Sequence, residues 1–497
     1  MSPRLFPAIC FGLISIFSLS ACKTTSDTTQ PVTANDTDMS QNTDFSLPEI
    51  PPAKLFQHAT PTIFQLDNGI DVWYVYNEIV PLMSMKVVFN RGASQDPADK
   101  SGLSSLTAAM LKEGANGRTA QQISDDIEFI GASLNPSITQ DAAAITLQVM
   151  TQYFEQGLDI LNDIWLKPDF TQTSYDRLQK IILNGLKQRE DSPNAIAKLA
   201  SNREYFGDEH PYSRSTDGYI ETIQKIDLKD IKENYTSLFT PDRAAFIAVG
   251  NIPADEFKTL LNDRFGKIKI QKAESTPLDI PPIPEPKLRV TVVDKPNAPQ
   301  TVIRIYQPSV VVTSPETLFW QFINIPLGGS FTSRLNQNIR EDKGYSYGAN
   351  SGVSTQKLAG VLLSASAVSA EVTGPALKEF IYELNRVPKG DFTQEEFDRA
   401  RETWKSELVQ SFETQAGVLA TISGLYLNGK STDFINAFAR NLDNLTLNDF
   451  NNYAKTFPTI NQATITLVGD KNLILEQIKD LNLPEPTIRD VNGKLVK

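Results

Sequence analysis

The sequence predicts an α+β protein made of two copies of one domain, with mainly antiparallel sheets flanked by helices. DFTQTSYDR at Asp169–Arg177 returns as DFTQEEFDR at Asp391–Arg399, 222 residues later. AAFIAVGN, which ends at Asn251, returns as ATITLVGD, which ends at Asp470, after 219 residues. Two matches at nearly one spacing and in one order indicate a duplicated domain. Strand and helix patterns come in blocks rather than in strict alternation, which favours α+β over α/β.

Local patterns predict the strands of the first copy. Asp67-Asn68-Gly69 lies between two β-rich runs, which is a strong hairpin signal. MSMKVVFN follows and is expected to be the next strand. Alternating apolar residues around Leu147 predict a further, half-buried strand.

Other patterns predict helices. Apolar residues at helical spacing predict a helix over residues 99–113, with Gly114 suited to the position after its end. Thr119 and Gln122 form a capping box that would begin the next helix. Thr393 and Glu396 form the same box in the second copy.

The expected boundaries follow from the repeat and from composition. We expect an N-terminal domain over residues 56–275 and a C-terminal domain over 288–485, joined by the proline-rich stretch TPLDIPPIPEPK at 276–287, with a tail at 486–497. Of 497 residues, 40% are hydrophobic and 21% are charged, which is typical of globular proteins. The formal charge of −12 argues against a nucleic-acid partner, because the phosphate backbone requires a basic surface.

Residues 1–21 have the pattern of a signal peptide, with Arg4 before an apolar run that is short for a membrane span. The run ends in LSAC at Leu19–Cys22, which resembles a bacterial lipobox and implies acylation of Cys22. Lys23 rather than aspartate follows, and in Gram-negative lipoproteins this favours the outer membrane, facing the periplasm. Residues 22–55 would be a flexible tether. The alternative is an ordinary signal peptide in which the cysteine occurs by chance.

GLSSLTAAMLKEG, at Gly102–Gly114, resembles the zinc-binding segment of the M16 peptidases, the group of pitrilysin and the mitochondrial processing peptidase. The resemblance spans about residues 58–485. It implies two homologous domains of the LuxS/metallopeptidase type that form half of a clamshell. The family motif is His-x-x-Glu-His, but Ser105, Ala108 and Ala109 stand at those three positions. The third zinc ligand, a glutamate, would fall at Asn184 or Gly185.

Zinc in a catalytic site needs about three strong donors and a general base beside the bound water. Ser105, Ala108, Ala109, Asn184 and Gly185 supply neither, so we expect this chain to bind no zinc and to cut no peptide alone. The chain has two histidines. His210, in the segment HPY, is expected to be a hydrogen-bonded structural residue.

LGGSFTSRLNQNIREDKGYSYGA, at Leu327–Ala349, resembles the C-terminal motif of the same family. The resemblance implies that Arg340 and Tyr347 hold a peptide backbone near the scissile carbonyl. A guanidinium can bind carbonyl or carboxylate groups, and a tyrosine hydroxyl can donate to a developing oxyanion. The alternative is structural: Arg340 pairs with a carboxylate, and Tyr347 packs.

Two functions remain open. A chain that has Arg340 and Tyr347 but no zinc ligands resembles the non-catalytic subunit of the two-chain M16 peptidases. Its partner would be an M16 chain that carries His-x-x-Glu-His and the zinc. The ligand would be a peptide, and the lipid anchor would provide membrane attachment. The second possibility is a scaffold or peptide-binding module with no role in proteolysis.

Overall fold

The protein is described here by a computed structural model that covers residues 58–272 and 280–496. The predicted signal peptide, the lipidation residue Cys22 and the tether lie outside the described residues. From residue 58 onward the described chain belongs to one compact unit. Within it, no helix combines the length and the apolar character needed to cross a membrane.

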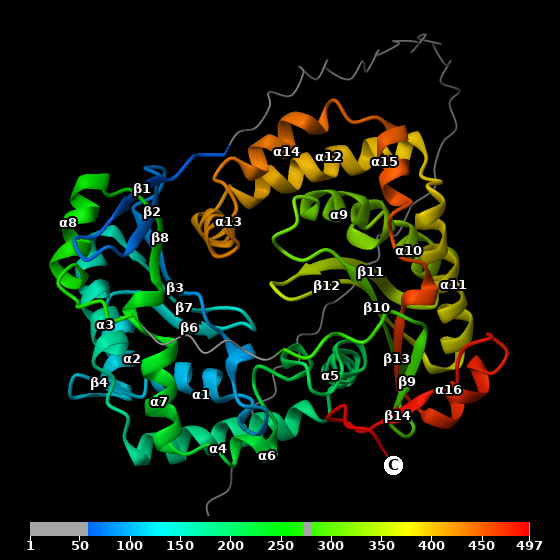
Figure 1. The fold of residues 1–497 in the computed structure, drawn as a ribbon, viewed down its shortest axis with the longest axis horizontal. Helices are drawn as coiled ribbons and strands as arrows, with labels where there is room; N and C mark the ends of the chain where they lie inside the picture. The colour runs from blue at the N-terminus through cyan, green and yellow to red at the C-terminus, as the bar shows by residue number, and fades with distance from the viewer. Residues whose placement is uncertain (1–57, 273–279, 497) are drawn as a thin grey trace, which may run out of the picture. The chain divides into compact units, whose positions relative to one another are not determined.

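The N-terminal half contains a six-stranded sheet in the order β1-β2-β8-β3-β7-β6 (Figure 1). The strands are β1 (Thr62–Gln65), β2 (Asp71–Tyr76), β3 (Leu82–Phe89), β6 (Ser133–Ile138), β7 (Ala143–Met150) and β8 (Ala244–Gly250), with a short separate ladder of β4 (Gly114–Ala115) and β5 (Arg118–Thr119). The α-helices are α1 (Leu103–Met110), α2 (Ala120–Phe129), α3 (Phe154–Leu166), α4 (Gln172–Arg189), α5 (Pro193–Phe206), α6 (Ile220–Ile223), α7 (Leu228–Leu238) and α8 (Ala254–Phe265).

The C-terminal half contains a second six-stranded sheet in the order β11-β12-β10-β13-β9-β14. The strands are β9 (Arg289–Asp294), β10 (Gln300–Ser309), β11 (Ser346–Thr355), β12 (Gly360–Ser369), β13 (Thr464–Gly469) and β14 (Thr487–Arg489). The α-helices are α9 (Thr317–Asn324), α10 (Arg334–Asn336), α11 (Thr373–Arg386), α12 (Gln394–Ser411), α13 (Gln415–Leu427), α14 (Phe434–Leu442), α15 (Leu447–Ala454) and α16 (Lys471–Ile478). Two π-helical segments, η6 (Ile325–Gly329) and η7 (Gln337–Asp342), flank α10.

The predicted fold class is confirmed: both halves are α+β and repeat one topology. Read from opposite ends, the two sheets have the same order, with β3 matching β10, β7 matching β12 and β8 matching β13. Parallel pairing in these sheets occurs at β2–β8, β9–β13 and β9–β14, and the other neighbours of the described strands are antiparallel. The repeat seen in DFTQ therefore extends to the whole domain.

The C-terminal segment is not only a tail, as residues 486–497 were expected to be. β14 pairs in parallel with β9 and takes the sheet position that β1 holds in the other half. Arg489 fixes this strand, because its buried guanidinium hydrogen-bonds to Glu204 at 2.9 Å and to Asp208 at 3.0 Å. The edge of the second sheet is completed by the chain end and held by carboxylates of the first half.

Each half covers part of the other half's sheet with a helix. α5, of the first half, packs Ile196, Ala197 and Ala200 on Val302 and Val468 of the second sheet. α13, its counterpart in the repeat, packs Val418, Ile422 and Leu425 on strands β2, β3 and β8 of the first sheet. Burial of an aliphatic side chain stabilises by about 1.5–3 kcal/mol. The two halves are therefore joined by apolar burial in both directions.

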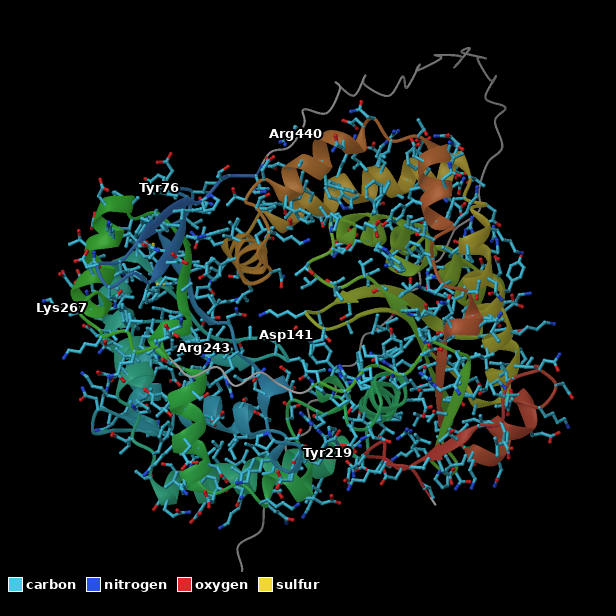
Figure 2. All side chains as sticks on the ribbon, viewed as in Figure 1. Tyr76, Asp141, Tyr219, Arg243, Lys267 and Arg440 are labelled. Atoms are coloured by element: carbon cyan, nitrogen blue, oxygen red, sulfur yellow. The ribbon has the colours of Figure 1, made fainter. Side chains whose placement is uncertain are left out.

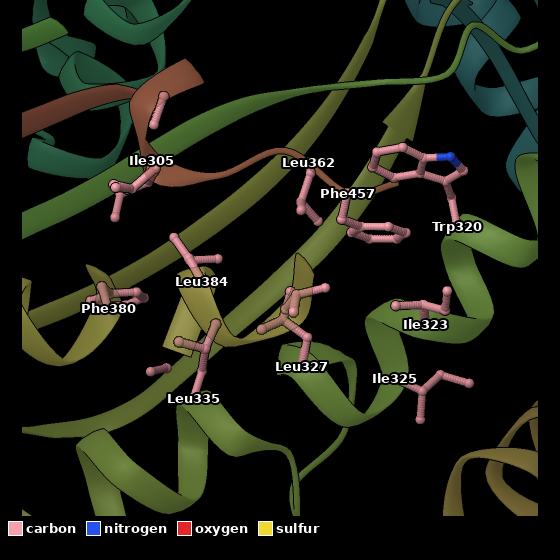
Figure 3. Close-up of a cluster of buried hydrophobic side chains, with 14 of the residues drawn as sticks. Ile305, Trp320, Ile323, Ile325, Leu327, Leu335, Leu362, Phe380, Leu384 and Phe457 are labelled. Atoms are coloured by element: carbon pink, nitrogen blue, oxygen red, sulfur yellow. The ribbon is translucent and has the colours of Figure 1, made fainter. Parts of the chain in front are cut away.

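The core of the C-terminal half lies between its sheet and helices α9, α11, α12 and α15 (Figure 3). Trp320 stacks on Phe457 with ring centroids 3.9 Å apart, and Leu327 and Leu335 carry the conserved-looking LGG…RL pattern into the same cluster. Both leucines are fully buried. The apolar residues of this motif thus anchor the segment from which its polar residues project.

The local signals were partly right. The hairpin forms, with Gly69 at φ +90°, and both capping boxes are present. The helix expected over 99–113 is shorter, because Gly102 adopts φ +96° and the Asp96 carboxylate accepts the amides of Gly102 and Ser104. Gly114 does not end the helix; it lies in β4.

Candidate functional site

The positions of the family's zinc motif lie on α1 and offer no metal site. Ser105 donates its hydroxyl to the carbonyl oxygen of Thr216, at 2.7 Å. Ala108 is 3% exposed, and Ala109 packs against the apolar cluster between α1 and α4. Methyl groups are not metal ligands, and the serine hydroxyl already has a partner. This face of α1 is used for packing.

The expected third-ligand position lies on α4. Asn184 and Gly185 are both exposed, and a Cβ added to Gly185 would meet nothing within 4 Å. Across residues 58–272 and 280–496, no three His, Cys, Asp or Glu side chains converge in a way that could hold a metal ion. The residues at the family's zinc positions therefore do not fit zinc, because they supply no set of donors and no general base.

His210 has the structural role that its HPY segment suggested. It is buried, and its Nδ1 accepts the backbone amide of Tyr212 at 3.1 Å. Its ring stacks on Phe206. Burial lowers its pKa, and the charge of Arg214 lowers it further, so the imidazole is held neutral.

The C-terminal motif divides into a buried part and an exposed part. Arg334 begins α10 and is almost fully buried, with its Nη1 2.6 Å from Asp391 and its Nη2 2.8 Å from Glu396. Its guanidinium also stacks on Phe392, 4.0 Å from the ring centroid. These partners belong to the DFTQEEF repeat. Arg334 therefore ties the motif to α12 and is not free to bind a ligand.

Arg340 lies near the end of η7 and is two-fifths exposed. Its Nε is 3.2 Å from the Glu341 carboxylate, and its guanidinium lies over the ring of Phe331, 4.8 Å from the centroid. Gly344, at φ +65°, then turns the chain into β11, as the sequence predicted. Arg340 has a carboxylate partner, but that partner is its exposed neighbour rather than a group in the core.

Tyr347 projects from β11, the edge strand of the second sheet, and is 92% exposed. The register of β11 against β12 shifts between Ser346 and Ala349, so the tyrosine lies in an irregular stretch of strand. It does not pack in the core, unlike Tyr345, which contacts the apolar cluster. The structural alternative for Tyr347 is therefore wrong.

One residue of this surface was missed in the sequence. Phe331 is 64% exposed, beneath the guanidinium of Arg340. Asn336 connects its loop to β11: the side-chain amide donates to the carbonyl of Phe331, and its oxygen accepts the amide of Ala349. The only signal was a phenylalanine among small polar residues in GGSFTS. Phe331, Arg340 and Tyr347, here called the exposed triad, are carried by segments that Asn336 joins.

Comparisons with known proteins agree with this geometry. Residues 72–214 match the family described as insulinase (peptidase family M16), and residues 225–403 match the peptidase M16 inactive domain. The non-peptidase homolog YmxG of Helicobacter pylori is 25% identical over 410 residues, which are 81% of this chain and 92% of that protein. A crystallised peptidase M16 inactive domain from Pseudomonas fluorescens superposes with a TM-score of 0.77 at 22% identity, over 83% of this chain and 98% of that one.

A third similarity concerns length. The first half of the periplasmic protease PqqL from Escherichia coli superposes with a TM-score of 0.70 at 17% identity, over 86% of this chain and 95% of that one. In the whole PqqL structure the TM-score is 0.69, and the match covers only 50% of that chain. The duplicated α+β fold, the two matched domains and the degenerate zinc helix lead to one conclusion: this chain belongs to peptidase family M16.

Proposed function

We propose that this chain is the non-catalytic, peptide-binding subunit of a two-chain M16 zinc peptidase. A partner chain with His-x-x-Glu-His supplies the zinc and the general base. This chain supplies Arg340 and Tyr347, which contact the substrate or the transition state in the partner's site. Both are exposed on the C-terminal half, whereas the zinc positions on α1 carry no ligands.

The observation that carries the proposal is the exposure of Tyr347. A tyrosine that is 92% exposed on an edge strand contributes little to stability through packing. Its neighbour Arg340 offers guanidinium donors, and Phe331 supplies an apolar surface beneath them. An arginine, a tyrosine and a phenylalanine gathered on a surface are the residue types enriched where proteins bind other chains.

The length comparison supports an assembly of two such units. This chain matches half of PqqL, so one protease of this fold contains two units of this size in a single chain. We infer that this chain forms the equivalent pair with a separate partner. The alternative is a scaffold with no role in proteolysis, for which an exposed triad of this kind has no evident purpose.

The test reconstitutes the complex with the zinc-bearing M16 partner and measures kcat and KM. Arg340→Ala or Tyr347→Phe is expected to lower peptide turnover about a hundredfold, since a lost oxyanion donor costs on the order of 3 kcal/mol. Melting temperatures should not change. Arg440→Ala and Tyr382→Phe, at other exposed sites, are the matched controls. Full activity in both triad variants would leave the scaffold function in place of this one.

We also propose that the chain is a lipoprotein of the outer membrane, anchored through Cys22 and facing the periplasm. The support is the LSAC sequence before Lys23. Mass spectrometry of the mature N-terminus tests this: an acylated Cys22 is expected in the native chain, and acylation that persists in Cys22→Ser would rule the anchor out.

A further inference from the structure

A pocket of about 600 Å³ lies between the two halves, apart from the exposed triad. The first half contributes the end of α4, helix α5 and the loop over residues 214–217. The second half contributes β10 and the strands β11 and β12. Its volume is in the range of small-molecule and peptide side-chain sites.

The walls of this pocket are strongly basic. Four cationic side chains line it, and one carboxylate does. The cations are Arg189, Lys198, Arg214 and Arg304, and the carboxylate is Asp217. None of the four cations forms an ion pair with a carboxylate of the described residues. In a chain with a net charge of −12, this concentration of unpaired positive charge stands apart from the rest of the composition.

Neutral groups hold the two arginines of the first half. Arg189 donates through Nη1 to the Ser215 hydroxyl at 3.0 Å and to the Gly218 carbonyl at 2.9 Å. Arg214 donates to the carbonyl oxygen of Asp96 at 3.2 Å. Burial lowers the pKa of both guanidinium groups, although neighbouring acidic groups act in the other direction. Charges taken partly out of water without an ionic partner are costly, and a bound anion would offset that cost.

The second half supplies the opposite wall. Arg304 lies on β10 between Val302 and Tyr306, and strand alternation turns all three toward α5. Its Nε donates to the Tyr306 hydroxyl, which in turn donates to Asn202 of α5 at 3.0 Å. Lys198 lies on the exposed side of the same helix. The contacts of Arg304 place a fixed guanidinium, and guanidinium groups bind carboxylates with two parallel hydrogen bonds.

Two further features favour a peptide over a free ion. Apolar side chains, including Leu199, Val361 and Leu363, form part of the wall. The pocket also adjoins the degenerate zinc helix, because the wall residue Thr216 accepts the hydrogen bond from Ser105. Asp141 (Figure 2), next to the wall residue Gln140, joins the halves at this place: it accepts the Tyr212 hydroxyl and, at 3.0 Å, the backbone amide of Lys357.

We propose that this pocket binds the side-chain carboxylates of acidic peptide segments. It thereby gives the chain a preference for peptides rich in glutamate or aspartate. The inference rests on the proposed peptide-binding function and adds the substrate class. The carboxylate forms charge-assisted hydrogen bonds with the arginines, and the aliphatic stem of a glutamate packs on the apolar wall.

The experiment titrates the purified chain, without a partner, by calorimetry at low salt. The probes are an amide-capped octapeptide of alternating Glu and Ala and its Gln counterpart. The Glu peptide is expected to bind at least tenfold more tightly than the Gln peptide. Lys198→Gln/Arg304→Gln should remove this preference, whereas Lys378→Gln/Arg440→Gln, with the same change in charge at sites outside the pocket, should keep it.

The outcomes separate the possibilities. Equal affinity for the two peptides, or an unchanged preference in the pocket variant, would overturn the proposal. Inorganic phosphate that binds more tightly than the Glu peptide, and depends on Arg304, would replace the peptide site by a phosphate site. If the double variant unfolds, Lys198→Gln alone must weaken binding, since its exposed side chain has no structural contact to lose. The reconstituted peptidase assay of the Arg340 and Tyr347 variants is independent of these titrations, so either proposal can fail without the other.

Discussion

Arg334 and Arg340 come from one motif, six positions apart, and have opposite surroundings. Arg334 is held by two carboxylates and an aromatic ring in the interior, and burial of Glu396 is outweighed by the hydrogen bonds that lower its pKa. Arg340 is exposed with one adjacent partner. The resemblance identified both positions, but only the surroundings show which arginine is structural.

Arg334→Met should therefore destabilise the chain strongly. Removing one partner of a buried ion pair leaves uncompensated charge on Asp391 and Glu396, at a cost of about 3 kcal/mol or more. Arg340→Met removes an exposed pair that is worth under about 1 kcal/mol. Urea unfolding of the two variants measures the difference. Equal stability of the two would mean that the Arg334 ion pairs contribute nothing net.

Asp96 predicts a pH dependence of stability. Burial raises the pKa of this carboxyl to about 6, although hydrogen bonds from Ser104 and Gly102 act in the other direction. Above pH 4 the unfolded chain loses this proton while the folded chain keeps it until about pH 6, so the stability from this group falls as pH rises through that window. Between pH 4.5 and 7.5 the loss is roughly 2 kcal/mol.

Asp96→Asn isolates this effect, because asparagine does not titrate. The free energy of unfolding of the native chain minus that of the variant should be larger at pH 4.5 than at pH 7.5. Urea titrations at the two pH values give this difference. A difference that is constant with pH would show that Asp96 has an ordinary pKa in the folded chain.

At the scale of elements, the exchange of α5 and α13 decides how the halves hold together. Ile422 of α13 is fully buried among residues of the first sheet, including Ile247 and Val249 of β8. This helix belongs to the second half by sequence but fills a core of the first.

Ile422→Ala should destabilise the chain by about 2–5 kcal/mol through lost burial and a cavity. Hydrogen exchange should rise in β8, in the other half, as well as in α13. The matched control is Ile181→Ala on α4, where the side chain is 53% exposed and the expected change is within about 0.5 kcal/mol. Faster exchange in α13 alone would show that the helix does not stabilise the first sheet.

Local patterns predicted what local interactions decide. The Asp67-Asn68-Gly69 hairpin and the Thr119 and Thr393 caps depend on residues a few positions apart, and all three form. The exchange of helices and the pairing of β14 depend on residues hundreds of positions apart, which no short pattern records. The exposed triad needed the resemblance for Arg340 and Tyr347, and Phe331 lay outside it. Unpaired charges such as Arg304 become visible only once their neighbours are known.

At the scale of the whole molecule, the two halves are one cooperative structure rather than two domains on a linker. α5 and α13 cross in opposite directions, Arg489 of β14 pairs with Glu204 and Asp208, and Tyr205 donates to the carbonyl of Gly360 at 3.1 Å. These contacts also form the walls between which the basic pocket lies.

Fragments 58–275 and 276–497 should therefore not fold independently. Each would expose the sheet face that the other's helix covers, and the second would lose the partners of Arg489. Alone, each is expected to show no cooperative melting by circular dichroism, and mixing them should restore a cooperative transition. A full-length chain cut once after residue 275 is the control, and it should melt close to the intact protein because its halves are already assembled. Two fragments that each melt cooperatively at the temperature of the intact chain would show that the exchanged helices add little, and that the linker alone keeps the halves together.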